Sequence, residues 1–87
     1  MITARDYTNI NKDLIRKYKR AVRLIEKGKF GYDGTMPKEC VKPMYESKIA
    51  RHSEANQYLR AFAPEHTLTD DELYKVRAII NGRPYLH

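Results

Sequence analysis

Apolar side chains return every three or four positions between residues 10 and 27, as they do on the buried face of an amphipathic helix. This pattern predicts a first helix over about 10–27. Asn9 or Asn11 is suited to cap its start, and Gly28 is suited to end it in a left-handed conformation. The side chains expected to face the core are Ile10, Leu14, Tyr18, Ala21, Val22 and Ile25.

A second helix is predicted over about 43–62, because Pro43 suits a first helical turn and Pro64 prevents continuation. Lys48 falls on its apolar side, either at the edge of the helix or as a charge within an interface. The side chains expected to face the core are Val41, Met44, Tyr45, Ile49, His52, Leu59 and Phe62.

A third helix is predicted over 70–81. Thr69 and Glu72 have the spacing of a capping box, and Gly82 follows the last helical residue. Leu73, Val76 and Ile80 recur at helical spacing and are expected in the core. With an irregular Gly- and Pro-containing loop between the first two helices, the sequence predicts a single all-α domain over 1–87.

The net charge of the chain is +6, and its distribution is uneven. Residues 12–29 carry eight basic and two acidic side chains, so this segment holds the whole excess. Six of the cations share the face of the first predicted helix opposite its apolar side, at steps of three and four residues. We call these six the basic stripe: Lys12, Arg16, Lys19, Arg20, Arg23 and Lys27.

Enzyme motifs are absent from the sequence. His52, His66 and His87 lack the spacing of a helical metal pair and are not coupled to a recognisable nucleophile motif. The segment GKFGYDG lacks the pattern of a phosphate-binding loop and follows a helix instead of opening one. We therefore expect no catalysis, no cofactor and no metal.

The sequence also bears on compartment and partners. One cysteine, Cys40, fits a reducing compartment, and no apolar run is long enough to cross a bilayer, so we expect a cytoplasmic protein without a membrane partner. Three helices with seven tyrosines offer more apolar surface than so small a core hides. This surplus predicts a homodimer.

A row of like charges favours binding to a polyanion, since the mutual repulsion is relieved when phosphates arrive. RNA fits best, and the backbone of duplex DNA fits almost as well. Lys29 of the following loop adds one charge, and Phe30 and Tyr32 either present two stacking rings beside the stripe or pack under the loop and close the core. An acidic protein partner and a merely solvated face are the alternatives. A helix-turn-helix mode is disfavoured, because Asp70 and Asp71 would face the phosphates.

The basic helix KDLIRKYKRAVRLIEKGK, followed by the glycine loop KFGYDG, resembles the small host-takeover proteins of bacteriophages, and among them the TifA-type family of RNA-binding toxin–antitoxin inhibitors. The resemblance rests on residues 12–34 and assigns no roles to individual residues. It implies a homodimer that binds RNA in the host cytoplasm and blocks an RNA-acting defence system. The alternative within this class is an inhibitor that docks its basic helix on an acidic host protein.

Overall fold

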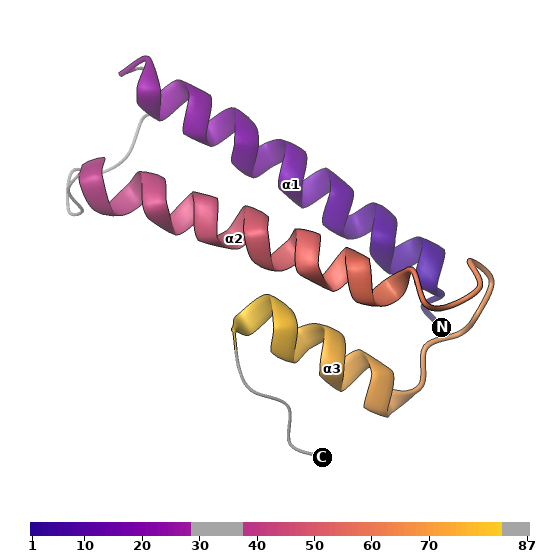
Figure 1. Ribbon diagram of the computed structural model, residues 1–87. Coiled ribbons are helices and arrows are strands. Elements are labelled where there is room, and N and C mark those ends of the chain that lie inside the picture. The colour runs from indigo at the N-terminus through magenta and orange to yellow at the C-terminus, as the bar shows by residue number, and fades with distance from the viewer. Residues whose placement is uncertain (29–37, 83–87) are drawn as a thin grey trace.

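The computed structural model describes residues 1–28 and 38–82, and in these residues the protein is all-α, as predicted. Helix α1 spans Ala4–Glu26, α2 spans Lys38–Leu59 and α3 spans Asp70–Asn81. Figure 1 shows α1 and α2 side by side and antiparallel, while α3 lies along the C-terminal half of α2. Helix α2 contacts both of the others and is therefore the central element.

The first helix begins about six residues earlier than predicted, and neither Asn9 nor Asn11 caps it. Thr3 is the N-cap: its hydroxyl oxygen accepts from the backbone N–H of Asp6 at 3.2 Å. The Asp6 carboxylate accepts from the N–H of Thr3 in return, also at 3.2 Å. This capping box provides hydrogen-bond acceptors for the N–H groups of Thr3 and Asp6 in the first turn of the helix. Because the helix begins here, Asn9 and Asn11 lie inside it.

The connection between α2 and α3 is bonded to the start of α1. The N–H groups of Ala4 and Arg5 donate to the carbonyl oxygens of His66 and Pro64, at 2.9 and 3.1 Å. These bonds take up helix donors that have no partner within α1. One antiparallel bridge joins Thr3 to residue 67, and the N–H of residue 68 donates to the carbonyl of residue 2.

The ends of α2 also differ from the prediction. The helix begins at Lys38, so that Pro43 lies inside it instead of opening it. It ends at Leu59, after which Ala61 and Phe62 make tighter turn bonds to the carbonyls three residues back, each at 3.2 Å. The chain therefore continues to coil as far as residue 62, where the sequence predicted the helix to end, but no longer as an α-helix.

Helix α3 is confirmed at both ends. Thr69 and Glu72 form the capping box, and Gly82 ends the helix with φ of 69°. Gly28 likewise has the left-handed conformation predicted for it after α1, with φ of 70°. A residue with a Cβ is strained in this conformation, which explains glycine at both ends.

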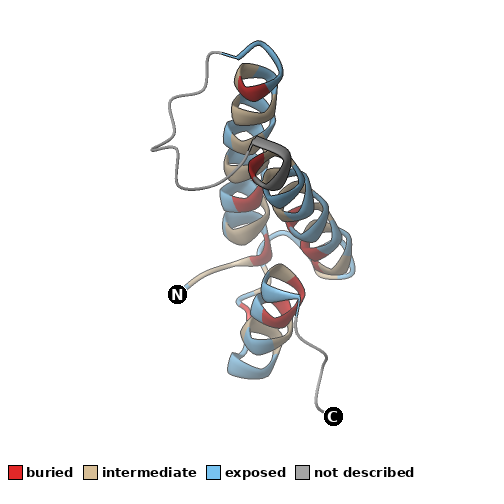
Figure 2. Ribbon diagram, turned by 90° about the vertical axis from the view of Figure 1, so that its left-hand side faces the viewer, coloured by how far each residue is buried: buried red, intermediate tan, exposed pale blue. Residues whose placement is uncertain are grey.

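Buried and half-buried positions along α1 and α2 alternate in steps of three and four, the spacing of coiled-coil contacts. We call the two rows together the seam. Figure 2 shows how the buried positions are interleaved with exposed ones along each helix. The seam consists of Ala4, Tyr7, Asn11, Leu14, Tyr18, Ala21 and Ile25 on α1, and of Val41, Tyr45, Lys48, His52, Ala55 and Leu59 on α2.

Two residues predicted to face the core are exposed instead. Ile10 is 47% exposed and Met44 is 36% exposed. Each precedes a seam residue by one position, Asn11 and Tyr45 respectively, and is therefore rotated by about 100° away from the contact. Both predictions were wrong because they treated an adjacent apolar residue as part of the contact face.

The apolar core lies at the end of the hairpin where α3 packs. Leu68 and Leu73, which bracket the capping box of α3, both belong to it, as does half-buried Ile80. Val76 has no exposed surface, in agreement with its predicted place. The buried members of this cluster are Ala4, Ala55, Leu59, Leu68, Val76 and Ile79.

A hydrogen-bonded polar cluster occupies the middle of the seam. Asn11 has no exposed surface, and its Nδ2 donates to Oδ1 of Asn56 at 2.8 Å. Its Oδ1 lies 3.0 Å from Nδ1 of His52, which therefore carries a hydrogen and donates it. Nδ2 of Asn56 donates in turn to the carbonyl of Thr8 at 3.4 Å. We call Asn11, His52 and Asn56 the polar cluster.

Lys48 lies within the interface, which decides between its two predicted positions. Its Nζ is 5.8 Å from the centre of the Tyr18 ring, within the range of a cation–π contact. The Tyr18 ring also lies 5.7 Å from Tyr45 and 5.8 Å from His52, centre to centre. Burial lowers the pKa of His52, and the positive charge of Lys48 lowers it further.

Asn11→Ala is expected to lower the free energy of unfolding by about 1–3 kcal/mol, because His52 and Asn56 lose their partner while remaining inside the interface. The measurement is urea unfolding followed by circular dichroism. Asn9→Ala is the matched control: the residue is exposed on the same helix, so its effect is expected within about 0.5 kcal/mol. Equal effects of the two substitutions would contradict the structural role of the cluster.

The free energy of unfolding is expected to fall as the pH drops from about 7.5 to about 5.5. Because the pKa of folded His52 lies below its unfolded value near 6.5, the unfolded chain binds the proton first and gains stability as the pH falls. His52→Asn keeps a donor near the position of Nδ1 but cannot titrate, so this variant should lose most of the pH dependence. An unchanged pH dependence in the variant would show that another group is responsible.

Candidate nucleic-acid interface

Five cations of the basic stripe lie on α1 and the sixth, Lys27, is the C-cap residue of this helix; all six side chains are exposed. The seam residues Asn11, Tyr18 and Ile25 turn toward α2, so the stripe is carried on the opposite side of the helix. At 1.5 Å per residue, the distance along the axis from Lys12 to Lys27 is about 22 Å. One unbroken helix therefore presents a straight row of cations to solvent.

Few carboxylates neutralise this row. Nη1 of Arg16 lies 3.6 Å from Oδ1 of Asp13, and both side chains are more than 70% exposed, so the pair is weak. Glu26, the other acidic neighbour, pairs with Lys42 of α2 at 3.4 Å. Within the described part of the chain, the other five stripe cations have no carboxylate partner.

The like charges repel one another at three- and four-residue spacing, and each pair costs a few tenths of a kcal/mol at low salt. Arg23 and Lys27 lie near the carboxyl end of α1, where the helix dipole favours positive charge. This position offsets part of the repulsion. The stripe is thus compatible with a stable helix and still has a charge excess available to an anion.

Arg5 extends the stripe by two turns. It lies seven residues before Lys12 on the same side of α1, and its guanidinium pairs with Glu65 at 3.1 Å in an exposed position. The predicted helix began after this residue and therefore missed it. The signal was present in the sequence, since Thr3 and Asp6 have capping-box spacing.

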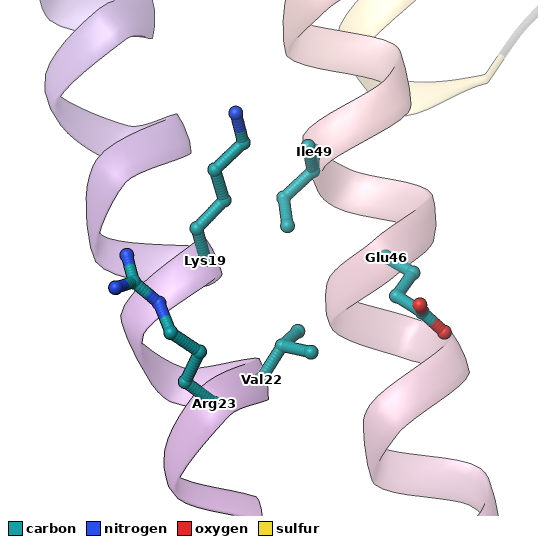
Figure 3. A pocket seen from close by; sticks show the side chains of 5 residues that line it. All are labelled: Lys19, Val22, Arg23, Glu46 and Ile49. Atoms are coloured by element: carbon teal, nitrogen blue, oxygen red, sulfur yellow. The ribbon is translucent and has the colours of Figure 1, made fainter. Parts of the chain in front are cut away.

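A surface hollow of about 400 Å³ lies between α1 and α2 beside the stripe. Figure 3 shows Val22 and Ile49 pointing toward one another across it, while the Glu46 carboxylate turns away from α1. Lys19 and Arg23 belong both to this hollow and to the stripe. We call it the α1–α2 hollow.

Two further hollows adjoin stripe cations. One, of about 420 Å³, lies along the C-terminal half of α1 and includes Arg16, Arg20 and Lys27 in its lining. The other, of about 560 Å³, lies where α1 begins and is lined partly by Arg5 and Lys12. Cationic side chains therefore border all three.

Lys29, Phe30 and Tyr32 lie outside the described residues, so their predicted contribution to binding stays a prediction. Among residues 1–28 and 41–82, no group of three or more His, Cys, Asp or Glu side chains is placed to hold a metal ion. No helix in the described chain is long and apolar enough to cross a membrane.

The two described histidines are both engaged in structural contacts. His52 is buried within the polar cluster, where a phosphate cannot reach it. His66 stacks on Phe62 with ring centres 5.0 Å apart, and its Nε2 lies 2.8 Å from Oε1 of Glu72. The backbone N–H of Thr69 and this contact with His66 both lower the pKa of the Glu72 carboxyl.

In comparisons with known proteins, no protein-family model, no curated protein and no solved structure matches the chain. The basic stripe and the residues around it are therefore the features of the molecule that point to a function.

Proposed function

We propose that the protein is a non-catalytic RNA-binding protein that holds the phosphate backbone against the basic stripe of α1. The observation that carries the proposal is the row of six exposed cations on one face, five of them without a described carboxylate partner. Backbone phosphates are the natural counterpart of such a row, because each contact releases a condensed counterion.

The chemistry of the stripe suits phosphates better than isolated carboxylates. Arg16, Arg20 and Arg23 can each present two N–H groups to one phosphate, and the lysines contribute point charges between them. The start of α3 does not suit the phosphates of a duplex, since exposed Asp70 and Asp71 lie in its first turn. Binding through α1 avoids this repulsion.

RNA is proposed over duplex DNA because an apolar hollow lies directly beside the stripe, and unpaired bases are most common in RNA. The resemblance to TifA-type inhibitors supports the same choice and extends it to a role: the bound RNA would belong to a defence system in the host cytoplasm that the protein inhibits. Docking of the stripe on an acidic host protein is the alternative.

A homodimer is part of the proposal because a second stripe would lengthen the footprint and add avidity. The large exposed apolar side chains of the described residues do not gather in one element. Met1 precedes α1, Ile10 lies on α1, Met44 on α2 and Tyr74 on α3. They assign no interface, so the dimer stays a prediction.

Replacing Arg16, Arg20 and Arg23 together by Ala should weaken RNA binding at least about hundredfold, because three charge-assisted contacts are lost. Helix content should not change, since all three are exposed and Ala favours helix. Fluorescence anisotropy and circular dichroism measure the two properties.

The matched control removes three exposed or half-exposed cations elsewhere, through Arg51→Ala, Lys75→Ala and Arg77→Ala on α2 and α3. This variant has the same net charge as the stripe variant and should retain most of the affinity. If both variants bind equally, net charge and not the stripe accounts for binding.

Salt dependence provides a second test of the wild-type protein. With six phosphate contacts, the slope of log affinity against log salt should be about −4 to −5, whereas the stripe variant should lose about 2–3 units of slope. Titrations at several salt concentrations measure it. A slope near zero would exclude phosphate binding and leave the stripe for a protein partner.

A further inference from the structure

The two sides of the α1–α2 hollow differ in charge, which is not true of the stripe alone. Lys19 and Arg23 form its rim on α1, whereas Glu46 is the acidic residue on the α2 side. A phosphate is therefore attracted to the α1 rim, and the α2 side, where the Glu46 carboxylate turns away from α1, supplies no cation to compete for it. A nucleotide held by its phosphate at this rim is within reach of the space between the helices.

The interior of the hollow matches the base of such a nucleotide. Val22 and Ile49 point into it from the two helices (Figure 3), so a flat, weakly hydrated group meets aliphatic surface there. Its volume of about 400 Å³ is within the range of small-ligand sites, about 300–1,000 Å³. No described carboxylate pairs with Lys19 or Arg23, so both are available to the phosphate.

We propose that the α1–α2 hollow is a binding site for one unpaired base of a single-stranded RNA whose flanking phosphates are held by Lys19 and Arg23. This inference rests on the proposed function and adds to it the class of RNA. A duplex can contact the stripe but cannot place a base between the helices without unpairing it. The site therefore makes the protein selective for unpaired strands.

The cations of α1 also mark a path for the rest of the strand, from the α1–α2 hollow to the hollow at the start of α1. The hollow at the start of α1 lies about 20 Å away along the helix axis, if the centres are taken near residues 8 and 21. Its rim also carries cations of α1, Arg5 and Lys12. A strand that follows the rim from Arg23 to Arg5 thus remains beside positive charge over its whole path.

The test compares two RNA strands of about 12 nucleotides, one normal and one in which every base is replaced by an abasic ribose. Fluorescence anisotropy with the wild-type protein should show at least about fivefold tighter binding of the normal strand. Ile49→Asn should reduce this ratio toward one while leaving the abasic strand unaffected. Ile10→Asn is the matched control, since Ile10 is exposed on α1 and lines none of the three hollows.

Photocrosslinking gives a readout that needs no folded variant. A strand containing 4-thiouridine should crosslink to the segments 19–23 and 46–49 of the wild-type protein, identified by mass spectrometry. Crosslinks confined to other segments would overturn the assignment of the hollow.

The remaining outcomes separate the two proposals. Equal binding of both strands with a steep salt dependence would overturn the base site and leave phosphate binding by the stripe intact. Absence of binding to either strand at low salt would overturn the proposed function itself. If an acidic peptide with one aliphatic side chain binds instead, and Ile49→Asn abolishes that binding, the hollow belongs to a protein partner and the inference is wrong.

Discussion

The buried amide of Asn11 fixes how α1 and α2 align. Its oxygen and its nitrogen are both bonded to α2, through His52 and Asn56, which lie one helical turn apart. A shift of one turn, about 5.4 Å, would remove these partners and leave polar groups unpaired inside the contact. The apolar seam residues would lose no hydrogen bond in such a shift, so they specify the register less strictly. As in coiled coils with one buried asparagine, the polar contact specifies the register.

The register in turn determines the surface. Because Asn11, Tyr18 and Ile25 face α2, the cations between them are turned to solvent, and Val22 is brought opposite Ile49. The same alignment brings Lys42 close enough to pair with Glu26, which keeps that carboxylate occupied on the α2 side. The α1–α2 hollow, unlike the stripe, is therefore a product of the alignment of two helices and not of one helix alone.

Features that a single helix determines could be predicted from the sequence, whereas features that depend on the packing of two helices could not. The caps of α3, the left-handed Gly28 and the exposed stripe follow from local spacing, and all are confirmed. The predicted start of α1 is too late because Asn9 and Asn11 are also suited to capping, whereas the Thr3 and Asp6 pair forms the cap. The α1–α2 hollow was not predicted, since nothing in either helix alone reveals which residue of the other lies opposite.

The contacts between the N-terminal segment and the α2–α3 connection have a consequence for the order of folding. Residues 2 and 68 are bonded although 66 positions separate them, so closing this contact early would carry a large entropic cost. The hairpin can instead zip from Ile25 and Val41, which are close in sequence, toward its far end. The first turn of α1 and the docking of α3 then complete the structure together and late.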